Sequence, residues 1–457
     1  MKRPQFTTLL ATTVVGVYLL VVAGATATVA DATAACTSWP LCAPSSVSAV
    51  VALGHRTAAL VVGLLLVSSV AIGWSDSSRR VKGALLAALA LYPVQVGMGA
   101  VVVFAGASGL TPGLHLGIAV AIFTALTAAL AWQLEADTGR DDVPEEPFEE
   151  SVVDAEPSES TVRFDSSFDR ARATLFAYFR LMKPRLMWLL ALVAAAGMSL
   201  AGGPGGLTVR TIVLTLGGGV LAIGASGTFN HVLERDIDRR MKRTSDRPLA
   251  TELVPVHNAL AFGFALAAAS LVAFLQVNVF AATLGFVAIV FYSVIYTLVL
   301  KPNTVQNTVI GGVAGALPAL IGWVGVTGEI GLPGVVLAVT IFLWTPAHFY
   351  NLALAYKDDY ARGGFPMMPV VSGETKTRKH IVWYLAATLA SAGVLTAVSD
   401  LGVFYAVTTV GFGALFLGMV VRLHRERTEG AAFRAFHASN AYLGALLVAI
   451  VVDSLVV

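Results

Sequence analysis

Asn230, Glu234 and Asp238 recur in steps of four residues after the stretch 211–229, which contains no charged residue. On a continuing helix this spacing places all three side chains on one face. Mg²⁺ prefers oxygen ligands, takes one or two carboxylates from a protein, and leaves other positions to a phosphate. The spacing therefore predicts a magnesium site for a phosphate-bearing substrate. The alternative is a positively charged anchor at a helix end, where the acids only balance the bases.

Basic residues close to these acids would neutralise a phosphate group. Arg243 and Arg247 follow the acids and would hold the phosphate oxygens that the metal does not reach. Lys301 ends an otherwise uncharged stretch, where it is either a snorkelling anchor or a phosphate ligand. The neighbouring residues Tyr296 and Asn307 complete a second group of candidate substrate-binding residues.

A third polar segment repeats the spacing of the first. Asn351, Ala355 and Asp359 also follow one another in steps of four, which indicates a degenerate internal repeat. Two acidic patches that face each other across a cavity would bind the metal-bridged diphosphate of an isoprenoid. Negative charge that grows on the departing diphosphate would then meet Mg²⁺ and basic side chains already in place.

The elements that must position these residues are membrane helices. The chain has 457 residues, of which 56% are hydrophobic and only 13% charged, and its mean hydropathy is +0.77. Soluble proteins carry about twice that charged fraction, so we expect an all-α, multi-pass membrane protein with no nucleic-acid partner. Stretches near the length that a bilayer requires predict thirteen spans: 8–30, 47–74, 81–104, 113–134, 186–201, 208–229, 256–275, 278–300, 307–325, 331–356, 380–398, 401–421 and 436–456.

An acidic segment divides the predicted spans into two groups. Residues 135–169 contain thirteen acids and two arginines and have almost no aliphatic run. Such a segment cannot bury a core, so we expect a four-helix domain at 1–134, a disordered linker at 135–175 and a nine-helix domain at 176–457. Lysine and arginine gather in alternate loops. By the positive-inside rule, the N-terminus, the linker and the candidate site would be cytoplasmic and the C-terminus outside the cell membrane.

The first four predicted spans hold a second constellation. His55 and His115 lie at similar predicted depth on different helices, which suits bis-imidazole ligation of a haem in a four-helix bundle. The alternative is two hydrogen-bonded interior histidines without a cofactor. Cys36 and Cys42 share one loop, predicted to be outside, and would be a local disulfide, a redox pair or two free thiols.

The motifs around these residues are Cys36-Thr-Ser-Trp-Pro-Leu-Cys42, Gly54-His55-Arg56, Gln95-Val-Gly-Met-Gly99 and Leu114-His115-Leu116. They resemble one four-helix half of the haem A synthases. The resemblance implies a haem-ligating histidine pair and redox-active cysteines. Members of that family often carry a glutamate where this chain has Ala52, and only one half is present. The resemblance therefore implies haem binding or hand-over more than oxidase activity.

Three motifs occupy the segments after the linker. They are Asn230-x-x-x-Glu234-x-Asp236-x-Asp238 with Arg243-Thr-x-x-Arg247-Pro-Leu, then Lys301-x-x-Thr-x-Gln-Asn-Thr-Val-Ile-Gly-Gly, and Trp344-x-Pro346-x-His348-Phe followed by Asp359-Tyr and Pro366-Met-Met-Pro. Together they resemble the UbiA superfamily of intramembrane aromatic prenyltransferases, and within it the protohaem IX farnesyltransferases, or haem O synthases. The resemblance covers about 176–457. It implies nine helices around a lipid-open cavity, with Mg²⁺ on Asn230, Glu234 and Asp238 and diphosphate on Arg247 and Lys301.

The resemblance also implies a reaction. Farnesyl diphosphate would ionise, a vinyl group of haem B would attack the C1 cation, and water would complete haem O, the precursor of haem A in terminal oxidases. The superfamily places acids at both ends of its second four-residue step. Ala355 stands at one end here, so Asp358 and Asp359 would do that work, with Lys357 beside them. His348 would orient haem or its propionates or assist water addition, unless it is only a buried hydrogen-bonded histidine.

Other functions fit parts of the same pattern. The diphosphate clamp would equally serve prenylation of a quinone ring or a lipid headgroup. The N-terminal half would be an electron-transfer cytochrome if its haem is permanent. A transporter is disfavoured, because transport folds place charge near the midplane and these spans carry it at their cytoplasmic ends. Besides farnesyl diphosphate, haem B and the lipid bilayer, the expected partners are haem A synthase or oxidase assembly proteins.

Overall fold

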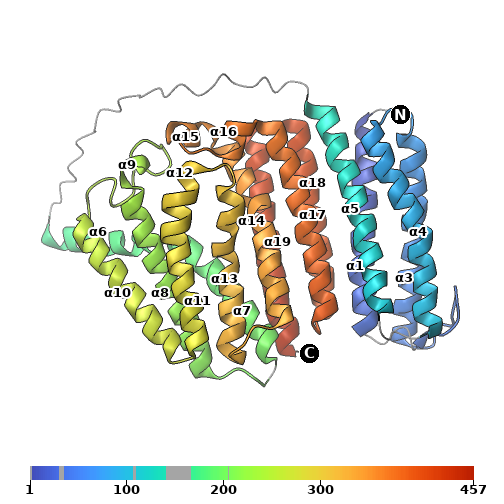
Figure 1. The fold of residues 1–457 in the computed structure, drawn as a ribbon, viewed down its shortest axis with the longest axis horizontal. Helices are drawn as coiled ribbons and strands as arrows, with labels where there is room; N and C mark the ends of the chain where they lie inside the picture. Colours follow the sequence, from blue (N-terminus) through green and yellow to red (C-terminus); the bar gives the residue numbers. More distant parts are fainter. Residues whose placement is uncertain (1–2, 30–34, 106–109, 140–165, 204, 457) are drawn as a thin grey trace. The chain divides into compact units, whose positions relative to one another are not determined.

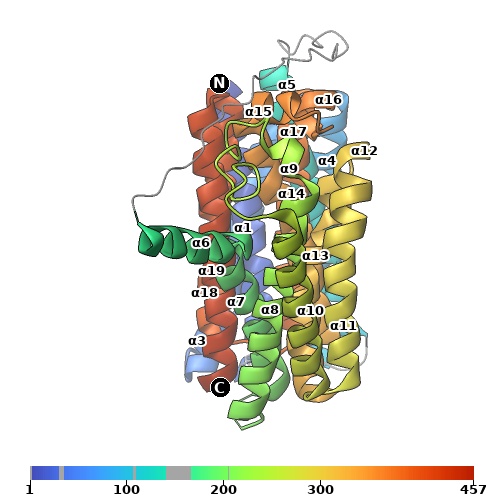
Figure 2. The same cartoon turned by 90° about the vertical axis from the view of Figure 1, so that its left-hand side faces the viewer.

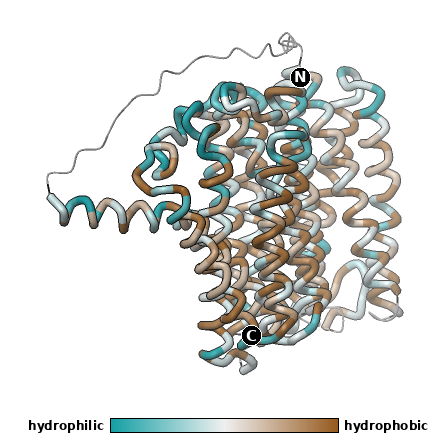
Figure 3. The backbone as a smooth tube through the Cα atoms, turned by 60° about the vertical axis from the view of Figure 1, so that its left-hand side comes forward, coloured by the Kyte–Doolittle hydropathy of each residue, from teal (hydrophilic) through white to brown (hydrophobic). Residues whose placement is uncertain are grey.

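Long apolar helices make up most of the described part of the chain. The computed structural model describes residues 3–29, 35–105, 110–139, 166–203 and 205–456 (Figure 1). Within these ranges helices dominate and no strand occurs. Thirteen helical segments are long and apolar enough to cross a membrane, and apolar residues run along them in Figure 3. The predicted all-α membrane fold and its number of spans are confirmed.

The first of two compact units contains residues 1–142 and 375–457. The unit therefore joins the start of the chain to its end. Helix α1 packs against α3, α5 and α18, α4 packs along α5, and α18 packs along α19. The helices of this unit are α1 (Arg3–Val29), α3 (Val47–Gly73), α4 (Arg79–Ala105), α5 (Thr111–Thr138), α17 (Glu374–Val398), α18 (Val403–Glu426) and α19 (Glu429–Val456).

Polar contacts join the early and late helices of the first unit. Arg425 of α18 donates a hydrogen bond to the Oγ1 atom of Thr8 over 2.9 Å. Lys379 of α17 forms an ion pair with Glu135 of α5 at 2.5 Å. The predicted domain boundaries stay a prediction, and these contacts show that α17 and α18 pack against the first helices.

The second compact unit contains residues 143–374. Helix α10 packs along α8, α7 along α13, and α13 along α14. Figure 1 shows the short helices α9, α12, α15 and α16 at the same end of this unit. Its elements are α6 (Ser167–Leu181), α7 (Pro184–Gly202), α8 (Val209–Leu233), α9 (Arg235–Asp238), α10 (Val256–Leu275), α11 (Val279–Val290), a π-helix (Phe291–Leu300), α12 (Lys301–Asn303), α13 (Asn307–Thr327), α14 (Leu332–Ala355), α15 (Lys357–Arg362) and α16 (Met368–Ser372).

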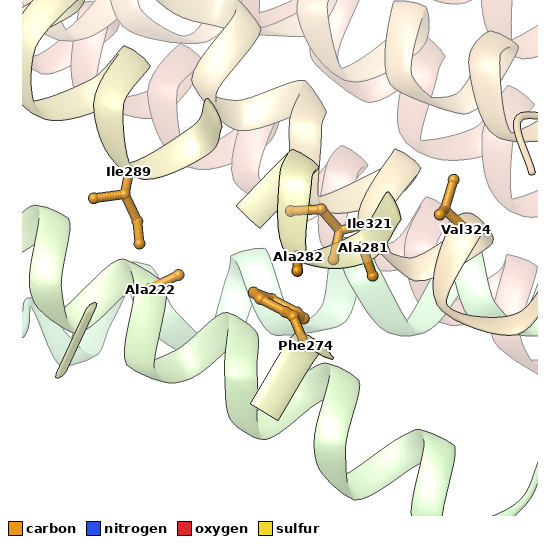
Figure 4. Packing of buried hydrophobic residues seen from close by; sticks show 7 residues of the cluster. All are labelled: Ala222, Phe274, Ala281, Ala282, Ile289, Ile321 and Val324. Carbon is orange, nitrogen blue, oxygen red and sulfur yellow. The ribbon is translucent and has the colours of Figure 1, made fainter. Parts of the chain in front are cut away.

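In the core of the second unit, the large side chain of Phe274 packs among small residues of neighbouring helices. Phe274 is fully buried among Ala222, Ala281 and Ala282 (Figure 4). A Cβ atom at Gly285 would lie 2.5 Å from the Phe274 ring. The small residues of α8 and α11 thus leave room for this phenylalanine of α10, and the three helices can pack closely around it.

Helices α7 and α13 touch backbone to backbone. A Cβ atom at Gly322 would lie 2.0 Å from the carbonyl oxygen of Ala194, and one at Gly197 would lie 2.3 Å from that of Ala319. Small residues permit such close approach between membrane helices. Lys183 directly precedes α7, so this contact also fixes the position of Lys183.

Substituting valine for Gly322 should destabilise the protein. The new side chain would push against the α7 backbone, and overpacking of this kind costs about 1–3 kcal/mol. We expect thermal unfolding of the purified protein in detergent to occur at lower temperature. Gly217→Ala is the matched control, because a Cβ atom there meets nothing within 4 Å. An unchanged unfolding temperature for Gly322→Val would contradict the close contact.

The ends of the predicted linker are helical. Helix α5 continues to Thr138, and α6 begins at Ser167 after Ser166. The Ser166 Oγ atom accepts a hydrogen bond from the backbone N–H of Asp169 over 3.1 Å, which is a typical N-cap. The rest of the predicted linker, residues 140–165, lies outside the described residues. The prediction of a disordered linker was therefore too wide at both ends.

Candidate active site

Asn230, Glu234 and Asp238 lie on one side of the chain, although the helix does not continue straight through them. Helix α8 ends at Leu233, and Glu234 adopts a non-helical conformation before α9. The backbone N–H of Glu234 still donates to Asn230 O over 2.9 Å, and that of Asp238 to Glu234 O over 2.8 Å. This register keeps the three side chains together, and all three are buried.

The two carboxylates converge on a single cationic atom. Arg247 Nη1 lies 2.7 Å from Asp238 Oδ2 and 3.8 Å from Glu234 Oε2. Lys301 Nζ lies 2.5 Å from Glu234 Oε1. Four residues that the sequence singled out are thus brought together: two buried acids and two bases from distant parts of the chain. Two buried carboxylates that meet at one point also suit a divalent cation.

Asn230 contacts a lysine that was not among the predicted site residues. Lys183 donates hydrogen bonds to the Asn230 Oδ1 atom and, over 3.1 Å, to the hydroxyl of Tyr292. The Asn230 amide also donates to Thr297 Oγ1 over 3.1 Å. Lys183 precedes α7 in a left-handed conformation, with φ of 56°. In the sequence it resembles any basic residue at the end of a span, so only the fold reveals its position.

The charges in the site influence one another. Although burial alone would raise the pKa of the Glu234 carboxyl, Lys301 and Lys183 hold this pKa below its ordinary value. Burial, with the charge of Arg247, lowers the pKa of the Lys183 amine to about 7. The site therefore keeps the Glu234 carboxylate ionised. A phosphate group that enters the site would stabilise the protonated form of the Lys183 amine.

A π-helix positions the aromatic wall of the site. In Phe291–Leu300 the backbone winds with i→i+5 hydrogen bonds, a rare geometry that is frequent at functional sites. The Thr297 hydroxyl donates to Tyr292 O over 2.8 Å, and the rings of Tyr292 and Tyr296 stack with centroids 5.5 Å apart. Tyr296, a predicted substrate-binding residue, lies against Gly311, where a Cβ atom would clash with its ring at 2.6 Å.

Asp359 contacts the loop that directly follows the first acidic cluster. Its two carboxylate oxygens each accept a backbone N–H over 3.1 Å, one from Lys242 and one from Arg243. Arg362 also donates to this carboxylate. The Arg243 guanidinium donates to the Tyr360 hydroxyl over 3.1 Å. Asp359 thus holds the loop that carries Arg243, and its role as a metal ligand stays a prediction.

Four other predicted site residues, three from the third segment and one from the second group, lie in different surroundings. Asp358 is exposed, and Lys357 pairs with Glu374 at 3.7 Å. His348 is buried and its ring stacks on Trp344 with centroids 4.3 Å apart. Asn307 is also buried and donates to Thr304 O over 2.7 Å, which closes the start of α13. The predicted roles of these four residues in binding or catalysis remain predictions.

The first acidic cluster offers a small set of oxygen atoms that could bind a metal ion. Among the described residues, no three histidines, cysteines, aspartates or glutamates gather in one place. Glu234 and Asp238 nevertheless supply two carboxylates, and Asn230 supplies an amide oxygen beside them. Mg²⁺ needs no more than this from a protein when a diphosphate and water complete its coordination. The residues present therefore fit the metal.

In the first unit, both predicted haem ligands have a buried ring nitrogen without a partner. The Nδ1 atoms of His55 and His115 are buried and form no hydrogen bond within the described part of the chain. His115 Nε2 lies 3.2 Å from Gln95 Nε2. The His55 ring lies beside Gly24 of α1, where a Cβ atom would approach it to 3.1 Å. Orphaned imidazole nitrogens at a glycine-lined position are compatible with a bound group.

The loop between α1 and α3 is closed covalently. Cys36 and Cys42 form a disulfide, with Cα atoms 5.7 Å apart. Arg56 of α3 donates to the carbonyl oxygens of Ser38 and Cys36 over 2.7 and 3.0 Å, and its guanidinium lies 5.0 Å from the Trp39 ring. Of the three predicted alternatives for Cys36 and Cys42, the structure shows the disulfide. Arg56 holds this loop, a role that its position next to His55 did not suggest.

Known proteins share both the sequence and the fold. The model of the UbiA prenyltransferase family matches residues 189–444. Protoheme IX farnesyltransferase 1 of Natronomonas pharaonis is 65% identical over 460 residues, and the alignment covers 100% of both chains. Protoheme IX farnesyltransferase of Halobacterium salinarum strain R1 is 57% identical over 463 residues, which are 99% of this chain and 98% of that one.

A solved structure supports the fold independently. The structure of digeranylgeranylglyceryl phosphate synthase in membranes superposes with a TM-score of 0.53, covering 62% of this chain and 100% of that chain at 16% identity. At this identity the likeness concerns the fold alone. Because the family model spans more than half of the chain and the named relatives align over nearly all of it, the chain belongs to the UbiA prenyltransferase family, beside relatives named protohaem IX farnesyltransferases.

Proposed function

We propose that this chain is a protohaem IX farnesyltransferase. It transfers the farnesyl group of farnesyl diphosphate to a vinyl group of haem B and, with water, forms haem O and diphosphate. The names of its full-length relatives support this substrate pair. The observation that carries the proposal is the meeting of Glu234 and Asp238 with Arg247 and Lys301 in one buried cluster.

This cluster would bind the diphosphate. Glu234, Asp238 and the Asn230 amide oxygen would hold Mg²⁺, which when bound neutralises the phosphate oxygens and stabilises the leaving group. Arg247 and Lys301 now neutralise the carboxylates. Their N–H groups would donate to the diphosphate oxygens, with Arg247 offering a planar pair of donors and Lys301 a compact charge.

Lys183 would add a third cation to the diphosphate site. Its amine already lies against Asn230 and Tyr292. The stacked rings of Tyr292 and Tyr296 would border the reacting end of the isoprenoid. Aromatic faces attract cations, so these two rings would stabilise the allylic cation while the haem vinyl group approaches.

The N-terminal helices would bind haem. Their likeness to half of a haem A synthase supports His55 and His115 as the ligands, and both imidazole rings are largely buried with an Nδ1 atom that has no partner among the described residues. Such a haem would serve hand-over to the transferase or to haem A synthase and oxidase assembly proteins. An electron-transfer role is the alternative. By the positive-inside rule, the transferase site would face the cytoplasm and the disulfide loop the outside.

Alanine in place of His55 should remove haem from the first unit. The whole chain, purified without added haem, should show a Soret band, and His55→Ala should lose most of it because one axial ligand is gone. His437→Ala is the control, since His437 is exposed on α19. A Soret band of full height in the His55 variant would exclude His55 as a ligand.

Product identification tests the proposed reaction. The whole chain is assayed anaerobically with haem B, farnesyl diphosphate and Mg²⁺, and the products are analysed by mass spectrometry. We expect a porphyrin product that has gained one farnesyl group and one hydroxyl group at a former vinyl group. A prenyl group on an aromatic acid or on a glycerol headgroup instead would favour the alternative acceptors that the same clamp could serve.

A further inference from the structure

Helix α6 carries a row of large apolar side chains that the described residues leave uncovered. Phe168, Leu175 and Phe179 are 74%, 74% and 50% exposed. Their spacing of seven and four residues places them on one side of the helix. The other side buries Ala177 and Leu181 against Leu249, Val254 and Ala259. The protein thus covers one side of α6 and leaves the apolar side open.

The position of α6 follows from the length of the helix that comes next. Helix α7 has 19 residues, so it spans about 28 Å at about 1.5 Å per residue. The hydrocarbon core of a bilayer is about 30 Å thick, and α7 must therefore use all of its length to cross. The corner between α6 and α7 must lie at the membrane surface. Figures 1 and 2 show α6 running crosswise to α8 and α10, which places it along that surface.

The charge of this segment complements an anionic surface. Residues 167–185 contain five bases and one acid. Arg180 is paired with Asp246 at 2.7 Å. Arg172, beside Phe168 and Leu175 on the helix, and Arg185 in the first turn of α7 are exposed and form no ion pair with any described residue. Helices with this combination of apolar and basic residues bind at the headgroup region of anionic membranes.

We propose that α6 is a membrane-surface helix on the side of the active site. Its apolar side inserts between the acyl chains of that leaflet, and Arg172 and Arg185 bind anionic lipid headgroups. An acidic segment of the chain itself would neutralise the arginines, but it would not cover Phe168, Leu175 and Phe179. The lipid surface accounts for both the apolar and the basic groups.

Lipid contact of α6 would also steady the active site. A Cβ atom at Gly227 of α8 would lie 2.9 Å from Leu181 O and 3.2 Å from Lys183 Cγ, so the α6–α7 corner packs tightly on the helix that carries Asn230. A surface-bound α6 therefore holds Lys183 in place. This consequence rests on the proposed function, whereas the lipid contact does not.

Quenching by brominated lipids tests the insertion of α6. Leu175→Cys is labelled with a fluorophore in the full chain, whose native cysteines are bonded to each other, and the protein is placed in nanodiscs. Arg170→Cys, exposed on another side of α6, is the control. The Leu175 label should be quenched at least about threefold more, because interfacial helices bury their apolar face about 5–10 Å deep. Equal quenching of the two labels would overturn the proposal.

The same labels test the lipid headgroup. Quenching of the Leu175 label should be about twofold or more stronger in anionic than in neutral nanodiscs, because each basic side chain near an anionic surface favours binding. Arg172→Gln with Arg185→Gln should remove this difference. Quenching that does not depend on lipid charge would overturn the headgroup assignment. None of these measurements requires haem O formation, so a failed farnesyltransferase assay would leave the α6 proposal standing.

Discussion

Replacing Asp238 by alanine should abolish haem O formation. Asp238 is buried, and its two carboxylate oxygens accept hydrogen bonds from Arg247 over 2.8 and 2.7 Å. The variant loses a proposed metal ligand and the partner of Arg247. Removing one group that stabilises charge in a transition state costs about 10²–10³ in kcat, and a lost ligand should bring the decrease to at least about 10³-fold. Membranes assayed with haem B, farnesyl diphosphate and Mg²⁺ provide the measurement.

Asp236 offers the matched control. Its side chain is 69% exposed and pairs with Arg235 at 3.0 Å. Exposed ion pairs contribute little, so Asp236→Ala should keep activity within about twofold of the wild type. Asp238→Asn preserves the size of the side chain and should be nearly as inactive as Asp238→Ala. Full turnover by either Asp238 variant would refute the role of this carboxylate.

Substituting alanine for Lys183 should weaken the use of farnesyl diphosphate. The amine lies against Asn230 and Tyr292, close to the acids, where it would bind a phosphate oxygen. A hydrogen bond to a charged group contributes about 1.5–3 kcal/mol, which corresponds to roughly ten- to hundredfold in kcat/KM for farnesyl diphosphate. Steady-state kinetics with varied farnesyl diphosphate at saturating haem B would measure the decrease.

Arg185 is the control for Lys183. It lies two residues further on, at the same end of α7, and its side chain is exposed. Both variants are assayed in neutral lipid, where Arg185 has no anionic headgroup to bind. Arg185→Ala should then leave kcat/KM for farnesyl diphosphate within about twofold of the wild type, as expected of a surface charge. Equal losses in the two variants would show that Lys183 acts only as one of several basic residues at the membrane surface.

The spans could be predicted from the sequence, because a membrane helix needs little more than a long apolar run. The sequence composition predicts a disordered linker up to residue 175, which includes most of α6, because the many acids before this helix dominate the composition. Its own pattern, with Ser166 as the cap and Phe168, Leu175 and Phe179 in helical spacing, was the signal that could have found it.

The site was predictable where spacing carried the information. Steps of four residues placed Glu234 and Asp238 together, and the position of Arg247 after these acids indicated a phosphate ligand. For Lys301 the sequence left an anchor or a phosphate ligand open, and the resemblance favoured the ligand. Lys183 was missed because its contact with Asn230 bridges 47 positions along the chain. The π-helix could not be read from apolar periodicity, which does not distinguish i→i+4 from i→i+5 winding over so few residues. The contacts of Asp359 with the backbone N–H groups of Lys242 and Arg243 were not predictable from spacing, and its role as a metal ligand stays a prediction.

The most direct test of the central claim is the binding of farnesyl thiodiphosphate, a slowly reacting analogue, with Mg²⁺ and with excess EDTA. If Glu234 and Asp238 hold Mg²⁺ for the diphosphate, the wild type should bind the analogue at least about a hundredfold more tightly with Mg²⁺, as expected when a metal and bases neutralise a diphosphate together. Glu234→Gln should lose this dependence. Equal affinity of the wild type with Mg²⁺ and with EDTA would contradict the account.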